Sequence, residues 1–289
     1  MGGRMEGLEM DGREHLIEFN KLAIAKADGS DEMINRVMTR DNIALSVVLK
    51  IKEPIYSNGV LPANPSENVA GTPIVVSTAH IHWDPEFCDV KLVQTMMLVQ
   101  ELAKILQEVA GRYRLLSAQV PLLVCGDLNS LPESGVFEFL TKGRISSDHV
   151  DLKGFRGQTC LQKLSTASDP NIYTHPLKID SAYDTNTLPH TNFTLDFRGM
   201  IDYIFTTPSS LYKLGVLGPI EPLWLKQNKI IGYPHPHIPS DHIPLVCQYA
   251  IIPPYHQRHH AAANSAPPPS VSTPSGYHHF QGHPGPFGR

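Results

Sequence analysis

A strand, a long helix and a second strand follow one another within residues 73–126, and no other stretch constrains the fold as strongly. Residues 73–80 and 120–126 are rich in apolar side chains, which is typical of buried strands. Between them, apolar residues recur at three- and four-residue steps over about residues 86–110 and predict a helix with one apolar face. A strand–helix–strand connection places two parallel strands side by side, or nearly so, in one sheet. The unit therefore predicts an α/β fold in which the carboxyl ends of both strands share an edge.

Further strand patterns flank this unit. Their apolar residues alternate or form short runs bounded by Pro, Gly or polar residues. These patterns predict strands at residues 42–51, 191–197, 200–205 and 243–249, and a second helix after Pro132 that ends at Gly143. Between this helix and residue 191 the period is lost, and mainly irregular loops are expected.

Composition divides the chain into one large domain between two segments with little to bury. The 289 residues, 41% of them hydrophobic, allow one large domain or two small ones, and the patterning favours one. Residues 1–13 are Gly-rich and predict a flexible leader. Residues 253–289 are rich in His and Pro and predict a disordered tail. The predicted domain covers residues 14–252.

Charge and cysteine content narrow the class of protein. The net charge is −4 with His neutral, so any contact with nucleic acid has to rest on a local site and not on a broad basic surface. The four cysteines are widely spaced, without a Cys-x-x-Cys pair, and predict reduced thiols in a cytosolic or nuclear protein. The N-terminus has no apolar signal region, and no run reaches the ~18 apolar residues of a membrane helix. We therefore expect a soluble protein that is not secreted and does not enter a membrane.

Two polar residues follow the second strand of the unit. Asp127 and Asn129 stand two apart, so they point to the same side if the strand continues. A carboxylate and an amide at such a strand end suit metal-assisted chemistry on a phosphate, where one oxygen takes a proton and a neighbour orients the substrate. The alternative is a strand that ends in a turn, because Asp, Asn and Ser readily bond their own backbone. Taken alone, these residues favour the turn.

Polar residues also stand at the ends of three other predicted strands, at His80 to Asp84, at Asp202, and at Asp241 with His242. A lone histidine is more often structural than catalytic, and an Asp before a proline is a common turn start. Asp202 is harder to explain in this way, because an isolated carboxylate inside an apolar strand is very costly. His242 is its natural partner, since an Asp–His pair fixes one imidazole tautomer and supports the charged form. Four such clusters predict one shared site.

Three motifs of this site resemble the last three signature motifs of the endonuclease/exonuclease/phosphatase superfamily. They are Gly126–Ser130, Ile201–Ile204 and Ser240–His242, and both their order and their spacing match. The resemblance implies a two-sheet α/β sandwich that cleaves phosphodiester or phosphomonoester bonds with Mg²⁺.

Three longer strings, Asn35–Asn42, Ala79–Glu86 and Val90–Met97, are similar to a narrower group. These are the carbon-catabolite-repressor-type poly(A) deadenylases, the nuclease subunits of the cytoplasmic deadenylation complex. The resemblance covers about residues 14–249. It implies a magnesium-dependent 3′-to-5′ exoribonuclease that binds poly(A) RNA, shortens mRNA tails and releases AMP, in the cytoplasm and also in the nucleus.

The resemblance also implies a role for each residue of the site. Asp127 would be the general base that activates water, and Asp241 would help to hold magnesium. His242 would contact the phosphate as charge develops, Asp202 would orient His242, and His80 would be a further phosphate contact.

Three more residues would bind the substrate by the same resemblance. Asn129 would orient the scissile phosphate and the bound nucleotide, while Pro85 and Phe197 look like the two walls that hold an adenine base. An apolar wall and an aromatic ring can grip a base through its faces, at about 1–3 kcal/mol for each aromatic stack. Such a grip needs no long basic groove.

The chain departs from the family pattern at its start. Members begin with a strand ending in Asn and carry a Glu that is a principal magnesium ligand, both before the part of the fold that resembles residue 14 onward. No counterpart is recognisable in residues 1–13, so the resemblance implies an N-terminally incomplete sandwich. The leucine-rich repeats that dock longer members onto their complex are also missing, although other complex subunits stay expected partners.

Two alternatives stay open on the sequence. The first is a catalytically impaired, truncated form that acts only by binding RNA or partners. The second is a phosphatase or DNA-repair nuclease of the same superfamily, against which the string Trp83-Asp84-Pro85 argues.

Overall fold

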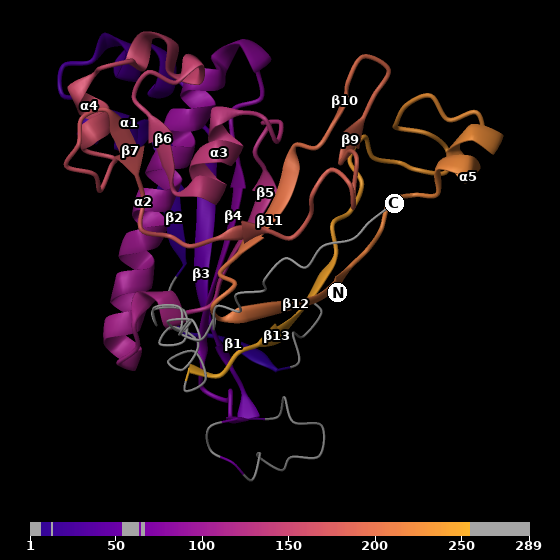
Figure 1. Cartoon of the computed structure of the whole chain (residues 1–289), viewed down its shortest axis with the longest axis horizontal. Coiled ribbons are helices and arrows are strands. Elements are labelled where there is room, and N and C mark those ends of the chain that lie inside the picture. The colour runs from indigo at the N-terminus through magenta and orange to yellow at the C-terminus, as the bar shows by residue number, and fades with distance from the viewer. Residues whose placement is uncertain (1–6, 13, 54–63, 65–66, 255–289) are drawn as a thin grey trace, which may run out of the picture.

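The computed structural model describes residues 7–12, 14–53, 64 and 67–254 (Figure 1). Within these ranges the chain forms a central mixed sheet with the long helix α2 (Cys88–Tyr113) running along it, and smaller two-stranded sheets lie around it (Figure 1). No helix of the described residues is long and apolar enough to cross a membrane. The α/β class predicted from the strand–helix–strand unit is confirmed.

The central sheet has seven strands, and the predicted unit lies in its middle. The strand order is β1, β3, β4, β5, β11 and β8, and β2 also pairs with β3. The strands span β1 Leu8–Met10, β2 His15–Glu18, β3 Ile43–Ile51, β4 Pro73–His80, β5 Leu122–Asp127, β8 Asp180–Ser181 and β11 Asp202–Thr206. As predicted, β4 and β5 are parallel neighbours, while the other pairs are antiparallel.

Helix α2 forms the crossover from β4 to β5. Its apolar residues at three- and four-residue steps, from Val90 to Val109, are buried, as the sequence predicts. A short 3-10 turn, Pro85–Phe87, leads into it, and the Asp84 carboxylate caps that turn by accepting from the Glu86 N–H at 2.9 Å. The helix ends where Arg114 takes a left-handed conformation, with φ of 55°.

The remaining helices are shorter. They are α1 Phe19–Lys26, α3 Gly135–Lys142, α4 Thr159–Gln162 and α5 Pro222–Gln227, with helical turns at Met33–Val37, Ser117–Gln119 and Val150–Phe155. Both α1 and α3 contact α2. Helix α3 is the predicted second helix: Ser134 Oγ accepts from the Phe137 N–H at 3.3 Å at its start, and Gly143 ends it with φ of 69°.

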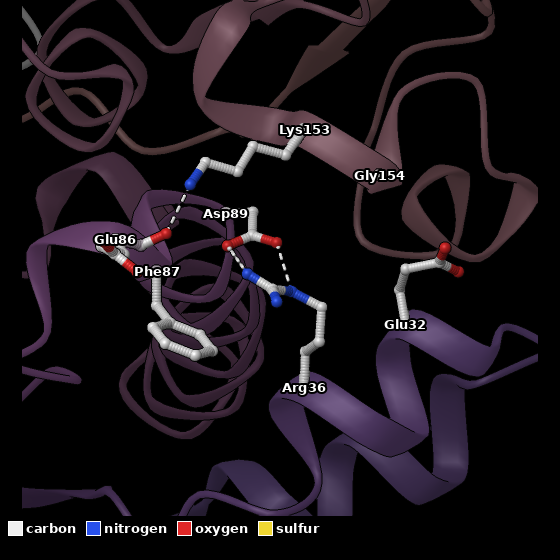
Figure 2. Close-up of a pocket in the computed structure, with 7 residues that line it drawn as sticks. All are labelled: Glu32, Arg36, Glu86, Phe87, Asp89, Lys153 and Gly154. Atoms are coloured by element: carbon white, nitrogen blue, oxygen red, sulfur yellow. Dashed lines mark hydrogen bonds and ion pairs between the residues drawn. The ribbon is translucent and has the colours of Figure 1, made fainter.

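A buried ion pair fixes the start of α2 (Figure 2). The Asp89 carboxylate, whose side chain is 1% exposed, accepts from Arg36 Nε at 2.7 Å through Oδ2 and from Arg36 Nη2 at 2.9 Å through Oδ1. That guanidinium also lies 4.5 Å from the centroid of the Phe87 ring. The hydrogen bond to Asp89 outweighs burial and raises the pKa of Arg36. The turn that carries Arg36 is therefore held firmly against the N-terminal end of the crossover helix.

The small sheets supply the second β layer and the loops around the site. They are β6 Arg144–Ser146 with β7 Ile172–Thr174, β9 Asn192–Phe193 with β10 Arg198–Gly199, and β12 Leu211–Val216 with β13 Cys247–Ile251. Burial first, and nearby Cys247 second, raise the pKa of the Cys125 thiol. Cys247 of β13 thus lies near Cys125 of β5.

Two predicted strands are shorter than expected. Within residues 191–197 only β9 forms, because a turn follows it: the Phe197 N–H donates to Thr194 Oγ1 at 3.1 Å and the Thr194 N–H donates to the Phe197 carbonyl at 2.7 Å. Within residues 243–249 the strand begins only at Cys247, since Pro244 has no N–H to donate to a ladder.

The predicted boundary at residue 14 is not where regular structure begins. Leu8–Met10, inside the predicted leader, form β1 and pair with β3. Asp11 then accepts a hydrogen bond from the Tyr113 hydroxyl at 2.6 Å, which ties this segment to the end of α2. Residues 1–6 and 13, and the predicted tail from residue 255, lie outside the described residues.

Candidate functional site

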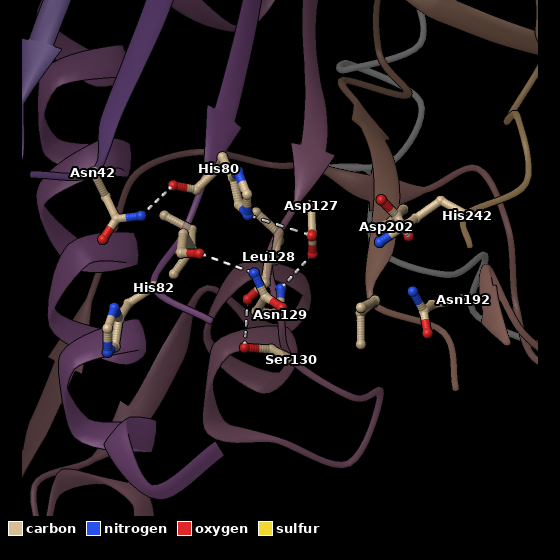
Figure 3. Close-up of polar contacts among 12 residues, drawn as sticks. Asn42, His80, His82, Asp127, Leu128, Asn129, Ser130, Asn192, Asp202 and His242 are labelled. Atoms are coloured by element: carbon tan, nitrogen blue, oxygen red, sulfur yellow. Dashed lines mark hydrogen bonds and ion pairs between the residues drawn. The ribbon is translucent and has the colours of Figure 1, made fainter. Parts of the chain in front are cut away.

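Three strands bring their polar ends into one row (Figure 3). His80 at the end of β4 is the register partner of Asp127 at the end of β5. Asp202 at the start of antiparallel β11 is the register partner of Asp127 on its other side. His80 Nε2 lies 3.5 Å from Asp127 Oδ2. The shared edge predicted from the sequence therefore places these three side chains next to one another across the sheet.

A single residue type permits the close approach of β4 and β5 at this edge. A Cβ atom on Gly126 would lie 2.0 Å from the carbonyl oxygen of Ala79, its register partner. Any side chain there would push the two strands apart just before His80 and Asp127. The glycine thus allows the row to form.

Asp202 and His242 form the predicted pair. His242 Nδ1 lies 2.7 Å from Asp202 Oδ2, across 40 residues of sequence. Thr191 Oγ1 holds the start of β11 by accepting from the N–H groups of Ile201 and Asp202, both at 3.0 Å. Burial acts to lower the pKa of His242, but its hydrogen bond with Asp202 and the surrounding carboxylates outweigh burial and raise this pKa. The imidazole is therefore favoured in its charged form.

Asp127 is a partly buried carboxylate with one oxygen engaged. Its Oδ1 accepts from the Asn129 N–H at 2.8 Å, while Oδ2 faces His80. Burial first, together with the charge of Asp202, raises the pKa of Asp127 although the Asn129 N–H acts in the opposite direction. A carboxylate with a raised pKa accepts a proton more readily than an exposed one.

Asn129 lies in a turn and not in a continued strand. The strand ends at Asp127, and Asn129 has φ of 47°, in the left-handed region. Its side-chain amide donates to the Ile81 carbonyl at 3.0 Å. The turn and the site, weighed as alternatives from the sequence, are both present, because the turn is what holds Asn129 beside Asp127.

Lys91 of α2, which sequence reasoning missed, holds this turn through a hydrogen bond to its backbone. Its Nζ donates to the Asn129 carbonyl at 2.7 Å, and the residue is only 6% exposed. Burial, as the main cause, lowers the pKa of its ammonium group. In the sequence, Lys91 stands among the apolar residues of the helix. Periodicity alone does not distinguish such a buried lysine from one that points into solvent.

Asn192 is the second residue that the sequence did not single out. It is buried on β9, and its Nδ2 donates to Asp241 Oδ2 at 3.2 Å. Its backbone pairs with His242 in an isolated bridge, and the neighbouring Phe193 N–H donates to the Asp241 carbonyl at 3.1 Å. Strand β9 therefore sets the position of the Asp241–His242 loop.

One cavity of about 730 Å³ collects the predicted residues. Seven of the eight line it: His80, Pro85, Asp127, Asn129, Phe197, Asp241 and His242. The eighth, Asp202, is bonded to His242. Pro85 comes from the turn before α2, whereas Phe197, with 39% of its surface exposed, comes from the β9–β10 hairpin. The apolar and aromatic residues predicted to hold a base thus open on the same space as the acids.

The carboxylates of the row fit a hard divalent cation in part. Ligand atoms of Asp127, Asp202 and His242 all lie within 4.8 Å of one another. Magnesium prefers oxygen ligands, so the two carboxylates suit it and the imidazole does not. Asp241, the predicted ligand, is not in this group of described residues; its Oδ2 lies 3.9 Å from His242 Nε2 and accepts from Asn192. Glu133 also lines the cavity, with an exposed side chain.

The site can be compared with known proteins. A model of the endonuclease/exonuclease/phosphatase family matches residues 40–242. The chain is 44% identical over 250 residues to CCR4-NOT transcription complex subunit 6-like-B of Xenopus laevis, covering 84% of this chain and 45% of that protein. It is 36% identical over 260 residues to the CCR4-Not complex 3′-5′-exoribonuclease subunit Ccr4 of Mycosarcoma maydis, covering 82% and 34%. The chain thus spans less than half the length of these relatives.

A solved structure shares the fold. The crystal structure of ANGEL2, a 2′,3′-cyclic phosphatase, superposes with a TM-score of 0.61 at 20% identity, covering 85% of this chain and 68% of that one. This likeness confirms the predicted α/β sandwich. The match over residues 40–242 includes His80, Asp127, Asp202 and His242. The chain therefore belongs to the endonuclease/exonuclease/phosphatase family, with CCR4-type exoribonuclease subunits among its relatives.

Proposed function

We propose that this chain is a magnesium-dependent 3′-to-5′ exoribonuclease that shortens poly(A) and releases AMP. The observation that carries the proposal is the row of His80, Asp127 and Asp202, with His242 bonded to it, at a cavity that Pro85 and Phe197 also line. Two relatives named as CCR4-NOT or Ccr4 subunits, one of them as a 3′-5′-exoribonuclease, support this reading.

Asp127 is the proposed general base. Its Oδ1 is engaged by the Asn129 N–H, which leaves Oδ2 to take a proton from an attacking water. Burial keeps the pKa of this carboxyl raised, which strengthens it as a base. The resulting nucleophile would attack the phosphorus in line with the leaving 3′ oxygen of the upstream nucleotide.

His242 and His80 are the proposed phosphate contacts. Asp202 bonds His242 at Nδ1 and favours the imidazolium, so Nε2 can donate to a phosphate oxygen as negative charge develops. His80 lies on the other side of Asp127 and is exposed, so it can reach the same phosphate. The two histidines would therefore flank the reacting group.

Magnesium, when bound, would supply positive charge to the phosphate, with the carboxylates of Asp241 and Asp202 as its proposed oxygen ligands. Asn129 would orient the scissile phosphate and nucleotide. Pro85 and Phe197 would hold the terminal adenine between them. We propose poly(A) RNA as substrate, other subunits of the deadenylation complex as partners, and the cytoplasm, with the nucleus, as the location.

The small number of oxygen ligands at the site supports one alternative, a catalytically impaired form. Among the described residues, the close group of ligand atoms holds two carboxylates and no Glu. A site with too few oxygen ligands would bind RNA without cleaving it, as expected of a catalytically impaired form.

The experiment incubates the purified chain with 5′-labelled oligoadenylate and Mg²⁺, and with oligouridylate as the matched substrate. The proposal predicts stepwise shortening of oligoadenylate from its 3′ end, AMP as the product, slower shortening of oligouridylate, and no reaction with EDTA. Binding of the labelled oligoadenylate without any shortening would favour the impaired form. Internal cleavage would contradict the exonuclease proposal.

A further inference from the structure

Trp83 presents a bare aromatic ring at the cavity that holds the candidate site. It lines this cavity together with Asp127, His242 and Pro85, yet 67% of its surface is exposed. A tryptophan side chain has a large apolar area, which folded proteins usually cover. Its ring contact among the described residues is a tilted one with His82, at 6.3 Å between centroids. Both its exposure and its place at the cavity therefore need an explanation.

The backbone on both sides of Trp83 is fixed. His82 is buried, and its N–H donates to Gln94 Oε1 of α2 at 3.0 Å. Asp84 caps the following turn by accepting from the Glu86 N–H at 2.9 Å. The ring is thus carried by a short segment with little freedom, and a group that is positioned in advance loses little entropy when a ligand binds.

The side chains that pack against His82, next to Trp83, are also held in place. The His82 ring meets Phe87 edge-on at 5.3 Å, and the guanidinium groups of Arg36 and Arg40 each lie 4.5 Å from the Phe87 centroid. Figure 2 shows Arg36 locked by Asp89 next to Phe87. Trp83 therefore stands on a rigid base, and its exposure does not come from a loose loop.

The position of Trp83 relative to Pro85 defines what it can bind. Pro85 and Phe197 are the proposed walls for the terminal base, and Trp83 precedes Pro85 by two residues on the same segment. A chain that leaves the slot toward its 5′ end has to pass the rim of the cavity. A ring that stays exposed at this rim offers its face to the next base.

We propose that Trp83 is a stacking platform for the base of the penultimate nucleotide, immediately 5′ of the nucleotide held at Pro85 and Phe197. This inference rests on the proposed exoribonuclease function. Stacking is tolerant of sequence because every base has a π-face. Trp83 would therefore bind a strand that has a penultimate base more tightly than a mononucleotide, without selecting adenine at this position. Loss of one stacked base weakens single-strand binding by about tenfold.

Fluorescence of Trp83 gives a direct readout, because the chain has only two tryptophans. In an Asp127→Asn, Trp224→Phe chain, Trp83 is the sole reporter and ribonucleotides stay uncleaved. We expect the dinucleotide ApA to quench the fluorescence of Trp83. Neither AMP nor an ApA analogue without its 5′ base should change this fluorescence. An Asp127→Asn, Trp83→Phe chain, in which Trp224 of α5 reports, should show no quenching. Equal quenching by AMP and ApA would place Trp83 at the terminal base and overturn the platform.

Affinity separates stacking from a structural role. Anisotropy of labelled oligoadenylate, again with Asp127→Asn, should show about tenfold weaker binding for Trp83→Ala and little loss for Trp83→Phe, because phenylalanine still stacks. Unchanged binding for Trp83→Ala overturns the platform. Binding of AMP should be equal in both variants, and a loss of AMP binding in Trp83→Ala also overturns it.

The two proposals fail in different ways. AMP release by the unsubstituted chain, with Trp83 unquenched by ApA, removes the platform and leaves the nuclease. Quenching by ApA without any AMP release supports the platform and removes the catalytic proposal. Failure of oligoadenylate to bind at all overturns both.

Discussion

At the scale of single residues, the site depends on side chains that act on their neighbours through fixed hydrogen bonds. Asp202 holds His242, the Asn129 N–H engages one oxygen of Asp127, and Lys91 holds the Asn129 carbonyl. Each contact leaves one atom free to work on a substrate, such as Oδ2 of Asp127. Loss of a supporting residue should therefore change the reaction rate more than substrate binding.

Lys91→Met tests this at the turn. Met keeps the length of the side chain but cannot donate to the Asn129 carbonyl, so the left-handed turn beside Asp127 loses its clamp. We expect kcat for AMP release to fall by about 10²-fold, as for a small misplacement of reacting groups, with a smaller change in KM. Lys104→Met, which removes an exposed lysine from the same helix, is the matched control. An equal loss in both variants would refute the clamp.

His190 makes the stability of the site's hairpin region depend on pH. It is 4% exposed, its Nδ1 accepts from Arg198 Nε at 3.2 Å, and its ring meets Phe193 edge-on. Burial first, and the charge of Arg198 second, lower the pKa of His190 to about 4. The unfolded chain keeps a pKa of about 6.5 and binds more protons below it, so stability falls as the pH decreases from about 6.5 to about 4.

His190→Gln removes this titration and keeps an acceptor for Arg198. Between about pH 6.5 and about pH 4, the free energy of unfolding should fall in both chains. The fall should be smaller in the His190→Gln chain, by up to about 3 kcal/mol. Urea unfolding monitored at several pH values measures the difference. Parallel losses in the two proteins would show that His190 is not the group responsible.

At the scale of secondary-structure elements, the site depends on how closely β4 and β5 approach. The parallel register sets His80 beside Asp127, and antiparallel β11 adds Asp202 on the other side. Helix α2 connects the two parallel strands and also supplies Lys91. One crossover unit therefore builds the row and supports the turn behind it.

Gly126→Ala should disturb this edge specifically. The added methyl would meet the Ala79 carbonyl oxygen at 2.0 Å, so the strands have to separate next to His80 and Asp127. Overpacking of this kind costs about 1–3 kcal/mol, and we expect a lower Tm together with a loss of AMP release. Gly215→Ala, where nothing lies within 4 Å of the added methyl, serves as the control. A Gly126→Ala chain with unchanged Tm and activity would contradict the close approach.

At the scale of the whole molecule, the strand–helix–strand unit and most of the site could be predicted from sequence. The apolar period of α2 and the branched residues of β4 and β5 are strong local signals. An acid within an apolar strand, Asp202, required a partner, and His242 is that partner in the structure, where Asp202 is partly buried. These predictions succeeded because burial and charge leave few alternatives.

The rest depended on contacts between distant segments. Leu8–Met10 form a strand because β3 offers an edge, which a Gly-rich leader does not reveal. The Thr194 hydroxyl turns the chain after β9 although Phe193 and Phe197 continue an alternating pattern. Asn192 becomes part of the site only because its strand pairs with the His242 loop. None of these follows from local period or propensity.

The central claim is that Asp127, at the middle of the row, is the base for release of AMP from an RNA 3′ end. The most direct measurement is the rate of AMP release from oligoadenylate with Mg²⁺ for the unsubstituted chain, Asp127→Asn and the exposed control Asp180→Asn. Asn keeps an oxygen for the Asn129 N–H but cannot accept the proton. We predict a loss of about 10²- to 10⁴-fold for Asp127→Asn alone. Equal rates for all three chains, or no AMP release by the unsubstituted chain, would contradict the account.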